Sequence, residues 1–430
     1  MAGASKCARF IGFDMRPSDE LRTLIDRLSR RETGRLVGAL TRSLGASALS
    51  LAEDCVQDAF VAALNTWGER GVPDNPFAWL LTTARNRGLD RLRRHAMMSA
   101  LEPKVGAWIE HLQAPASDAL ADEELSLIVL CCDPALEQEA RLALTLKSVC
   151  GFRVEEIARA FLTKPETIAQ RLVRAKARLR ELDVEFAIPA GVRLGERMPS
   201  VLRTIYLLFN EGYSASDGDQ LIRQDVCEEA LRLAELVAWH PVASSPEAHA
   251  LAGLISFQHA RHRARVAADG TPLVLEEQDR RLWDRAMIAR GFQHLAAARN
   301  ETTLTALHLE AGIASVHAAA ASWARTDWAA LVGYYDALAD VQPSPVVAVN
   351  RAIALAMSNG AEAGLDALKP LQSEKTMGRY LPYHLAVGDL EARAGRRSAA
   401  REAFQRALAL PMSGQERKLV EMKLLRASDA

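Results

Sequence analysis

Apolar residues recur every three or four positions along most of this chain, which is the spacing of amphipathic α-helices. The clearest example is the stretch NPFAWLLTTARNRGLDRLRR, Asn75 to Arg94. Asn75 can accept a hydrogen bond from the free amides of a first helical turn, and Pro76 fits the first helical position. The apolar stripe of this helix is predicted to face a core, and it consists of Phe77, Leu81, Ala84, Gly88 and Leu92.

A second stripe of the same helix combines an aromatic plane, hydrogen-bonding side chains and positive charge. It consists of Trp79, Thr82, Thr83, Asn86, Asp90 and Arg93. The segment around it is rich in arginine, with Arg85, Arg87, Arg91, Arg93 and Arg94 against the single acid Asp90. Aromatic planes beside cations suit exposed nucleic-acid bases better than they suit a protein core.

Three helices are predicted before this one. The first two run from Ser18 to about Arg31 and from Glu32 to Leu44, and the third runs from about Ser50 to Trp67. The outer face of the third helix carries Glu53, Asp54, Gln57 and Asp58. Taken alone, these side chains indicate an ordinary solvated helix surface. The loop WGERGVPDNP, rich in Gly and Pro, follows this helix.

Helical periodicity is lost between His95 and Ser117, which predicts an extended linker. A second compact helical unit is expected from Asp118 to about Asp183. Its first long helix is predicted to start at Asp133 and Pro134, to run to Cys150 and to stop at a glycine.

The segment VEEIARAFLTKPETIAQRLVRAKARLRE predicts a short helix, a tight turn from Leu162 to Lys164, and a second helix opened by Pro165. Two short helices joined by such a turn, with the second one basic, form a helix-turn-helix. Side-chain types that contact bases and phosphates gather at its exposed start and in the basic run that follows: Thr163, Lys164, Glu166, Thr167, Gln170, Arg171 and Arg174. The alternative is an ordinary helical hairpin with a charged outer face.

From Phe186 onward the composition shifts to Ala and Leu with helical periodicity, so helices are expected throughout. Two are marked by VLRTIYLLFNEGY, Val201 to Tyr213, and LEEQDRRLWDRAMIARG, Leu275 to Gly291. The pattern that begins at Asp327 recurs at Gly395, 68 positions later. This is twice the roughly 34-residue period of a tetratricopeptide repeat, a helical hairpin that binds peptides or other helices.

Bulk composition narrows the classes of function. With 430 residues, 49% of them hydrophobic, the chain can bury several cores and suggests roughly two to four domains. The formal net charge is −1, so contact with nucleic acid must come from local basic runs. The six cysteines form no CxxC pair, which favours reduced thiols in a cytoplasmic protein. No apolar stretch is long enough to span a bilayer, so no membrane partner is expected.

No catalytic or metal-binding constellation stands out. The sequence has no phosphate loop, nucleophile elbow or dinucleotide fingerprint. His259 and His262 could share one helix face, but no third ligand accompanies them, and a basic, solvated helix surface is the better interpretation. We therefore expect a protein that is not an enzyme and that has no cofactor and no metal.

Three segments resemble regions 2 and 4 of the extracytoplasmic-function (ECF) sigma factors of bacterial RNA polymerase. They are AEDCVQDAFVAAL from Ala52, NPFAWLLTTARNRGLDRLRR from Asn75, and EEIARAFLTKPETIAQRLVRAKARLR from Glu155, and the match covers roughly Asp19 to Asp183. The chain departs from the family pattern at Glu166 and Ala169. The C-terminal half resembles the large extension with tetratricopeptide-type repeats found in one group of these factors, through the stretches FNEGY and QDRRLWDR.

The resemblance implies an all-α fold with two small helical sigma domains and a helical-repeat C-terminal domain. The expected parts are a flexible tail (1–17), a region 2 bundle (18–97), a linker (98–117), a region 4 helix-turn-helix domain (118–183), a helical extension (184–300) and tetratricopeptide-like repeats (301–430).

The resemblance also implies a cytoplasmic transcription initiation factor whose partners are core RNA polymerase and promoter DNA. The set Glu53, Asp54, Gln57 and Asp58 would dock on the clamp of the largest polymerase subunit, and the region 4 domain on the flap of the second largest. The minus-10 element would be engaged by Trp67, Trp79, Thr82, Thr83, Arg85, Asn86, Asp90, Arg93 and Arg94. The minus-35 element would be read by Thr163, Lys164, Glu166, Thr167, Gln170, Arg171 and Arg174. The extension would regulate this activity, and its repeats could hold a peptide or protein partner.

Two other classes of function remain open at this point. A helix-turn-helix regulator that acts without polymerase would bind intact duplex DNA with an affinity that falls steeply as salt rises. A tetratricopeptide scaffold that had lost DNA binding would show no dependence on a promoter. The acidic helix face and the base-binding helix favour the sigma factor over both.

Overall fold

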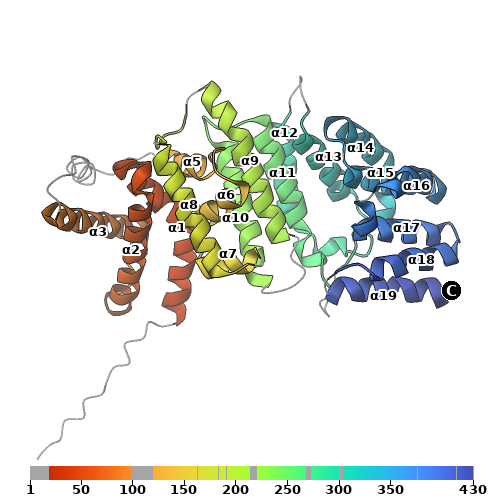
Figure 1. The fold of residues 1–430 in the computed structure, drawn as a ribbon, viewed down its shortest axis with the longest axis horizontal. Helices are drawn as coiled ribbons and strands as arrows, with labels where there is room; N and C mark the ends of the chain where they lie inside the picture. The colour runs from red at the N-terminus through yellow and green to blue at the C-terminus, as the bar shows by residue number, and fades with distance from the viewer. Residues whose placement is uncertain are drawn as a thin grey trace, which may run out of the picture. The chain divides into compact units, whose positions relative to one another are not determined.

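The computed structural model describes residues 19–98, 120–161, 163–182, 184–189, 191–213, 220–267, 273–299, 304–374, 376–412 and 414–429. Within these ranges the chain forms helices and no β-strand, which confirms the all-α class predicted from the sequence (Figure 1). The chain divides into two compact units, Met1–Arg197 (unit 1) and Met198–Ala430 (unit 2). The predicted tail (1–17) and all of the predicted linker (98–117) except Met98 lie outside the described residues.

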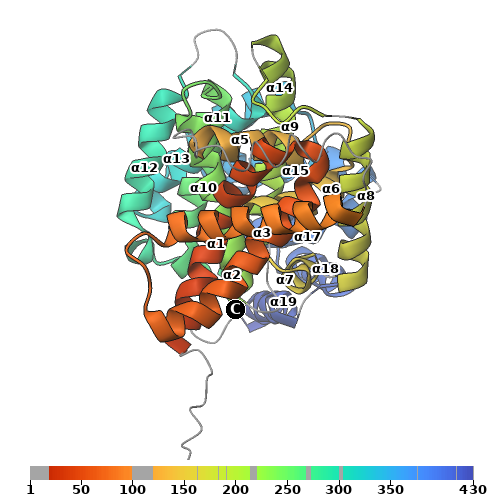
Figure 2. The same cartoon turned by 90° about the vertical axis from the view of Figure 1, so that its left-hand side faces the viewer.

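Unit 1 begins with a block of three long helices, which we call the first block (Figure 2). Its elements are α1 (Asp19–Leu44), the 3-10 turn η1 (Ala46–Ala48), α2 (Leu49–Arg70) and α3 (Pro76–Met98). The prediction of two helices before Leu44 is wrong, because Arg31 and Glu32 are good helix formers and let α1 run through without a break. Gly45 and Gly71 end α1 and α2 with φ of 81° and 80°, a conformation that glycine adopts at little cost.

The second block of unit 1 contains the helix-turn-helix. Its elements are α5 (Leu120–Cys131), α6 (Gln138–Leu144), the π-turn η2 (Thr145–Val149), α7 (Val154–Ala160) and α8 (Pro165–Glu181). The predicted start of a long helix at Asp133 is wrong, because the Asp133 carboxylate accepts a hydrogen bond from the Ala135 amide (2.8 Å) and holds a turn there. Helices α7 and α8 confirm the predicted short helix and the second helix opened by Pro165, while Leu162 of the predicted turn lies outside the described residues.

The two blocks pack against each other through closely spaced backbones. Helix α1 contacts α5 and η2, and η1 contacts α8. A Cβ atom added at Gly34 of α1 would lie 2.7 Å from the carbonyl oxygen of Val149, and one added at Gly38 would lie 2.7 Å from that of Glu123. Both distances are shorter than real Cβ contacts, so the absence of a side chain at these two glycines permits the packing.

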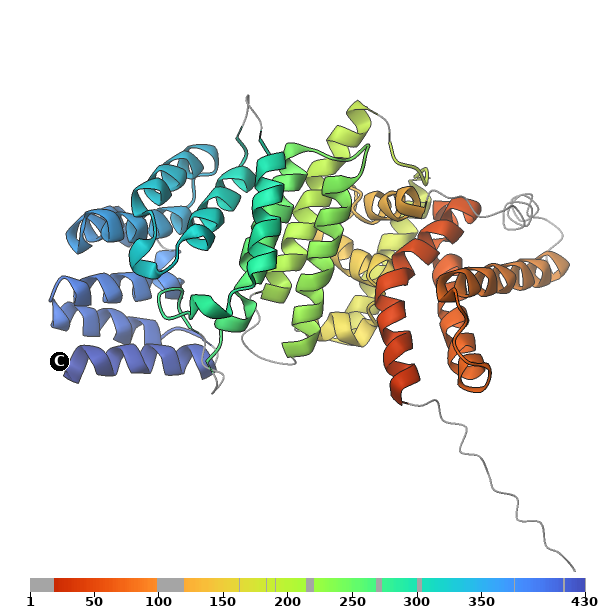
Figure 3. The ribbon, with the colours of Figure 1, turned by 180° about the vertical axis from the view of Figure 1, so that it is seen from behind.

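Unit 2 opens with a bundle in which the third helix packs on the helix before it and on the two helices after it (Figure 3). Its elements up to Ala319 are α9 (Val192–Tyr213), which begins in unit 1, α10 (Gln220–Trp239), α11 (Pro246–Ala260), the 3-10 turns η3 (His262–Ala264) and η4 (Arg280–Leu282), α12 (Arg285–Ala297) and α13 (Ala306–Ala319). The predicted helix from Leu275 to Gly291 is wrong in its first half. The Asp279 and Asp284 carboxylates cap two separate starts, accepting from the amides of Arg281 and Met287 (both 3.0 Å).

The remainder of unit 2 is a row of helices in which each packs on the next. They are η5 (Trp323–Arg325), α14 (Trp328–Val341), α15 (Pro345–Asn359), α16 (Ala361–Leu368), η6 (Lys369–Ser373), η7 (Met377–Arg379), α17 (Leu381–Arg393), α18 (Arg397–Leu408) and α19 (Gly414–Asp429). Helices α14, α16 and α18 start at 328, 361 and 397, close to the predicted spacing. The tetratricopeptide assignment itself stays a prediction. None of the described helices is long and apolar enough to cross a membrane.

Candidate nucleic-acid interface

Helix α3 presents two chemically different faces. The Asn75 side chain accepts a hydrogen bond from the Ala78 amide (3.0 Å), so the helix begins where the sequence predicted. On the inner face Leu81, Ala84, Gly88 and Leu92 are buried. Phe77 is half-buried beneath the guanidinium of Arg35, which lies 4.4 Å from the centre of its ring. The apolar stripe therefore anchors α3 in the first block.

The outer face of α3 lies at the surface. Five of the side chains expected to contact minus-10 DNA are exposed: Thr82, Asn86, Asp90, Arg93 and Arg94. Three more are half-buried: Trp79, Thr83 and Arg85. Burial lowers the pKa of Arg85, partly offset by the charge of Glu123, and still leaves a cation at neutral pH. The stripe thus offers one aromatic ring, several hydrogen-bonding groups and positive charge to solvent.

Trp67, the first residue of the predicted loop WGERGVPDNP, lies within α2, which continues to Arg70. Its side chain is only 3% exposed, and the indole N–H is buried without a hydrogen-bond partner. The rings of Trp67 and Trp79 meet edge to face, with centroids 5.3 Å apart at 65°. This geometry is favourable for aromatic pairs. Trp67 therefore lies beneath Trp79, and its expected contact with minus-10 DNA stays a prediction.

The expected acidic face of α2 is not one surface, because Glu53 points into unit 1. Glu53 is 7% exposed, and its carboxylate accepts hydrogen bonds from the hydroxyl of Ser148 and the ammonium of Lys176 in the second block. The expectation that Glu53 lies on an exposed face is therefore wrong for this arrangement. A buried carboxylate is costly unless it is paired, and these two partners supply that pairing.

The other members of the acidic set remain at or near the surface. Asp54 is exposed and accepts a hydrogen bond from Arg91 of α3 at 3.1 Å. Asp58 is half-buried and accepts one from the same guanidinium at 2.6 Å. Gln57 is exposed. Arg91 thus ties the hairpin of α2 and α3 together and neutralises part of the acidic charge that the sequence displays.

The helix-turn-helix places its predicted contact residues along the first half of α8 and the preceding turn. Lys164, Glu166, Gln170 and Arg174 are exposed, and Thr163 and Thr167 are half-buried. Arg171 is half-buried and forms an ion pair with Glu139 of α6. The opposite stripe, predicted to face inward, is buried and consists of Ile168, Leu172, Ala175 and Leu179.

A second polar link joins the two blocks at the start of α7. Glu156 is buried, accepts a hydrogen bond from the Arg153 amide (2.8 Å) and pairs with Arg30 of α1 (3.1 Å). Burial opposes its ionisation, but the hydrogen bonds from Arg153 and the charge of Arg30 outweigh this effect and lower the pKa of Glu156. We call this link, together with Glu53–Lys176 and Glu53–Ser148, the interblock contact.

The sequence reasoning missed the interblock contact, although one signal for it exists. Lys176 falls on the same helical stripe as the buried residues Leu172 and Leu179. A lysine on an apolar stripe is almost never buried unless it is paired. Its position therefore indicates a carboxylate across the interface, without saying which one.

Family models match three segments of the chain. Sigma-70 region 2 matches residues 28–97, which include α2 and nearly all of α3. Sigma-70 region 4 matches residues 126–179, which include α7 and most of α8. A family of unknown function, DUF6596, matches residues 197–299 in unit 2. The two sigma-70 matches therefore coincide with the two surfaces described above.

Three proteins are similar in sequence to parts or most of this chain. An uncharacterised protein of Rhizobium meliloti (strain 1021) is 38% identical over 400 residues, 90% of this chain and 94% of that protein. The ECF RNA polymerase sigma factor SigK of Mycobacterium ulcerans (strain Agy99) is 28% identical over 38% of this chain and 93% of its own length. The RNA polymerase sigma factor CarQ of Myxococcus xanthus is 32% identical over 36% of this chain and 86% of its own length. No solved structure shows significant similarity to the chain.

The matches agree with the geometry of unit 1. Both sigma-70 regions occur in the expected order, and each contains the surface that carries exposed hydrogen-bonding and basic side chains. Sigma-70 proteins are DNA-binding initiation factors whose partners are core RNA polymerase and promoter DNA, and they are not enzymes. The chain belongs to the ECF-like RNA polymerase sigma factors.

Proposed function

We propose that this sigma factor opens promoter DNA on the outer face of α3. The exposed stripe around Trp79, with Trp67 packed beneath it, carries this proposal. A rigidly supported aromatic ring gives an unpaired base a surface to stack on. Stacking contributes about 1–3 kcal/mol per base, which is comparable to the few kcal/mol that unpairing costs. Thr82, Asn86 and Arg93 then supply hydrogen bonds and charge to the separated strand.

Helix α8 reads the minus-35 element as duplex DNA in this proposal. The exposed side chains of Glu166, Gln170 and Arg174 would face base edges in the major groove, and Lys164 would bind phosphate. Arg171 contributes less to DNA binding in this proposal, because its ion pair with Glu139 offsets part of its positive charge. Contact at α8 would position the factor, and contact at α3 would melt the DNA.

Core polymerase binds the outer part of α2 through Asp54, Gln57 and Asp58, on the clamp of the largest subunit, while the second block contacts the flap of the second largest. Glu53 joins this surface only when the interblock contact opens, since Lys176 and Ser148 occupy its carboxylate. We therefore regard the closed arrangement of unit 1 as a resting form.

Unit 1 is too small to reach both promoter elements in its closed arrangement. Elements named for positions 10 and 35 are separated by about 25 base pairs, or roughly 85 Å at about 3.4 Å per base pair. A compact unit as long as unit 1 has a diameter of roughly 40–45 Å. One closed unit therefore cannot place α3 and α8 on both elements at once, so the two blocks have to separate on the promoter.

The extension regulates this opening in the proposal and takes the place of a separate anti-sigma factor. The chain carries as much protein after unit 1 as within it, which is far more than a sigma core needs. A truncation after Arg197 keeps the ion pair between Arg197 and Asp133 and removes all of unit 2. Unchanged transcription and unchanged regulation in that truncated chain would refute a regulatory role for the extension.

The first experiment is run-off transcription with bacterial core polymerase, the full chain and a library of promoter fragments. Trp79→Ala and Asn86→Ala should abolish specific initiation. Trp239→Ala is the matched control, since this tryptophan is 59% exposed and lies in unit 2. Retention of initiation by both α3 variants would contradict the proposed role of this face.

A further inference from the structure

Two stretches that the promoter-binding surfaces do not use, FNEGY and QDRRLWDR, meet inside unit 2 at the end of α11. The Tyr213 hydroxyl of the first stretch donates a hydrogen bond to Gln258 (2.8 Å) and accepts one from Arg261. The guanidinium of Arg265 lies 3.6 Å from the centre of the Tyr213 ring and donates to the Tyr213 carbonyl oxygen (2.7 Å). Tyr213 therefore lies between two arginines.

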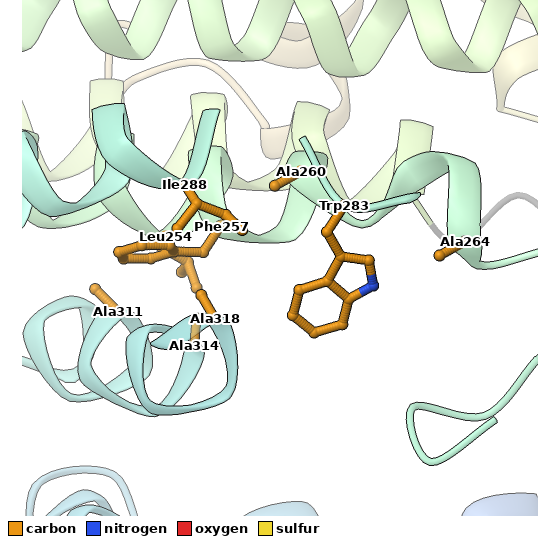
Figure 4. Close-up of a cluster of buried hydrophobic side chains, with 9 residues drawn as sticks. All are labelled: Leu254, Phe257, Ala260, Ala264, Trp283, Ile288, Ala311, Ala314 and Ala318. Atoms are coloured by element: carbon orange, nitrogen blue, oxygen red, sulfur yellow. The ribbon is translucent and has the colours of Figure 1, made fainter. Parts of the chain in front are cut away.

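Trp283 of the second stretch lies beside the same arginines. Its side chain is 3% exposed, and the guanidinium carbons of Arg280 and Arg261 lie 4.7 Å and 5.9 Å from its ring centre. Figure 4 shows the Trp283 ring next to a cluster of apolar side chains, with its nitrogen on the side away from Leu254 and Phe257. The indole ring thus packs against the core, and its nitrogen lies on the side away from Leu254 and Phe257.

Arg280 is the most deeply buried cation of the group, at 7% exposed. It donates hydrogen bonds to the carbonyl oxygens of His317 and Ala320 (both 2.6 Å) and to the hydroxyl of Thr326 (3.4 Å). These acceptors carry partial charge only. We call Arg261, Arg265 and Arg280 the arginine cluster.

The arginine cluster forms no ion pair with the described part of the chain. No described carboxylate lies within 4.0 Å of its guanidinium nitrogens. Burial and the positive charge of Arg261 lower the pKa of Arg280, and the same two causes lower that of Arg265 against the opposing effect of Tyr213. Arg280 is buried, and Arg261 and Arg265 are half-buried. Cations that are withdrawn from water are costly unless they are paired, so three of them at one place are an unfavourable arrangement without an anion.

The cluster also holds hydrogen-bond donors that meet no acceptor. The Nε of Arg261 and the indole N–H of Trp283 are both buried without a partner. A buried donor left unpaired costs about 1–3 kcal/mol. Water can satisfy such donors, but it cannot neutralise three guanidinium charges. Among the described residues the surplus is therefore one of charge as well as of donors, and one bound anion would offset both.

We propose that the arginine cluster is a binding site for a small oxyanion, the phosphate or carboxylate group of a soluble ligand. The planar fork of a guanidinium matches both groups through paired N–H donors, and the Trp283 N–H adds a directed donor. Anion binding at this site can be measured on the free protein, without a transcription assay. On the proposed function above, its occupancy is an input that the extension can pass to the sigma unit.

The test is a titration of the full chain with inorganic phosphate and, separately, with citrate in a low-salt sulfonate buffer. Tryptophan fluorescence should change with saturation, and the melting temperature should rise over the same concentrations. The tighter of the two anions identifies the chemical source of the group. No saturable change with either anion up to about 10 mM, where even a millimolar site would be filled, would overturn the proposal.

A matched pair of variants separates the site from general charge effects. Arg261→Gln should weaken anion binding by at least about tenfold, since the positive charge and the forked donor pair of the guanidinium are lost. Arg263→Gln removes the same charge from an exposed side chain two residues away and should bind as the parent does. Trp283→Phe keeps the packed ring and loses the N–H, so it should also bind more weakly. Equal affinity in Arg261→Gln and Arg263→Gln would show that the anion binds elsewhere and would refute the assignment.

Discussion

Replacing Lys176 by Met tests whether the interblock contact keeps unit 1 closed. The side chains of Lys176 and Glu53 are 16% and 8% exposed, so their ion pair is largely buried. Ion pairs at the surface, by contrast, contribute only about 0–1 kcal/mol. Removing one member of a buried pair costs about 3–5 kcal/mol because the remaining charge is stranded. Ser148 still donates to Glu53 after the change, so we expect the lower end, about 3 kcal/mol.

Lys176→Met should weaken the packing between the two blocks, because Lys176 and Glu53 belong to different blocks. A change of about 3 kcal/mol raises the open fraction of unit 1 by about a hundredfold. Hydrogen exchange measures this directly: amides of α1 and η2 that are protected by the packing should exchange faster, while amides within the α2–α3 hairpin should not. Affinity for core polymerase should rise as Glu53 becomes accessible.

Arg180→Met is the matched control, since Arg180 is exposed on the same helix and takes no part in the interblock contact. A double-mutant cycle with Glu53→Gln isolates the pair, and the two changes together should cost clearly less than the sum of their separate effects. The reasoning is refuted if Lys176→Met leaves both the exchange of α1 and η2 and the polymerase affinity at the level of Arg180→Met.

Three further outcomes can be measured on the full chain. Gly312→Ala should lower the melting temperature of unit 2, because the added Cβ would lie 2.4 Å from a ring carbon of Tyr334. Gly333→Ala adds its Cβ in open space on the next helix and should stabilise unit 2 by about 0.5–1 kcal/mol. Burial and two nearby arginine charges lower the pKa of His317 to about 4, so the unfolded chain binds more protons as the pH falls below about 6.5. Stability should then drop between about pH 6.5 and 4 by at most about 3 kcal/mol, and His317→Phe should flatten the denaturation profile in that window. Trp67→Ala should lower the free energy of unfolding, measured with denaturant, by about 3–5 kcal/mol, as expected for a buried aromatic side chain. An unchanged free energy of unfolding would show that Trp67 is not buried.

Helix existence and helix faces could be predicted from the sequence because periodicity reports directly which side of a helix is apolar. The inner and outer stripes of α3 and the buried stripe of α8 are of this kind. Helix starts were predictable at Asn75, which caps the helix before a proline, and at Pro165, which lies in the first turn of α8. The same reasoning failed at Asp133 and Pro134, where the Asp133 carboxylate holds a turn and the helix starts only at Gln138. The start capped by Asp284 was missed because it lies inside an apparently continuous helical pattern.

Partners across long sequence separations could not be predicted in this way. Glu53 and Lys176 are 123 positions apart, and nothing local distinguishes Glu53 from its exposed neighbour Asp54. The same holds for the arginine cluster, since the pattern around His259 and His262 predicts a basic, solvated helix surface, whereas Arg261 and Arg265 are half-buried. Pattern reasoning assigns a charged residue to solvent by default, so buried charges are the positions at which it fails.

The glycines of α1 have a genetic consequence. Any glycine codon becomes an alanine codon through one base change, and at Gly34 or Gly38 the methyl group so introduced would collide with a carbonyl oxygen of the opposite block. On the proposed resting form, such alleles would loosen unit 1 without altering its charge or its DNA-binding residues. A selection for constitutive promoter activity should therefore recover them as dominant gain-of-function mutations, far from any contact with DNA or polymerase.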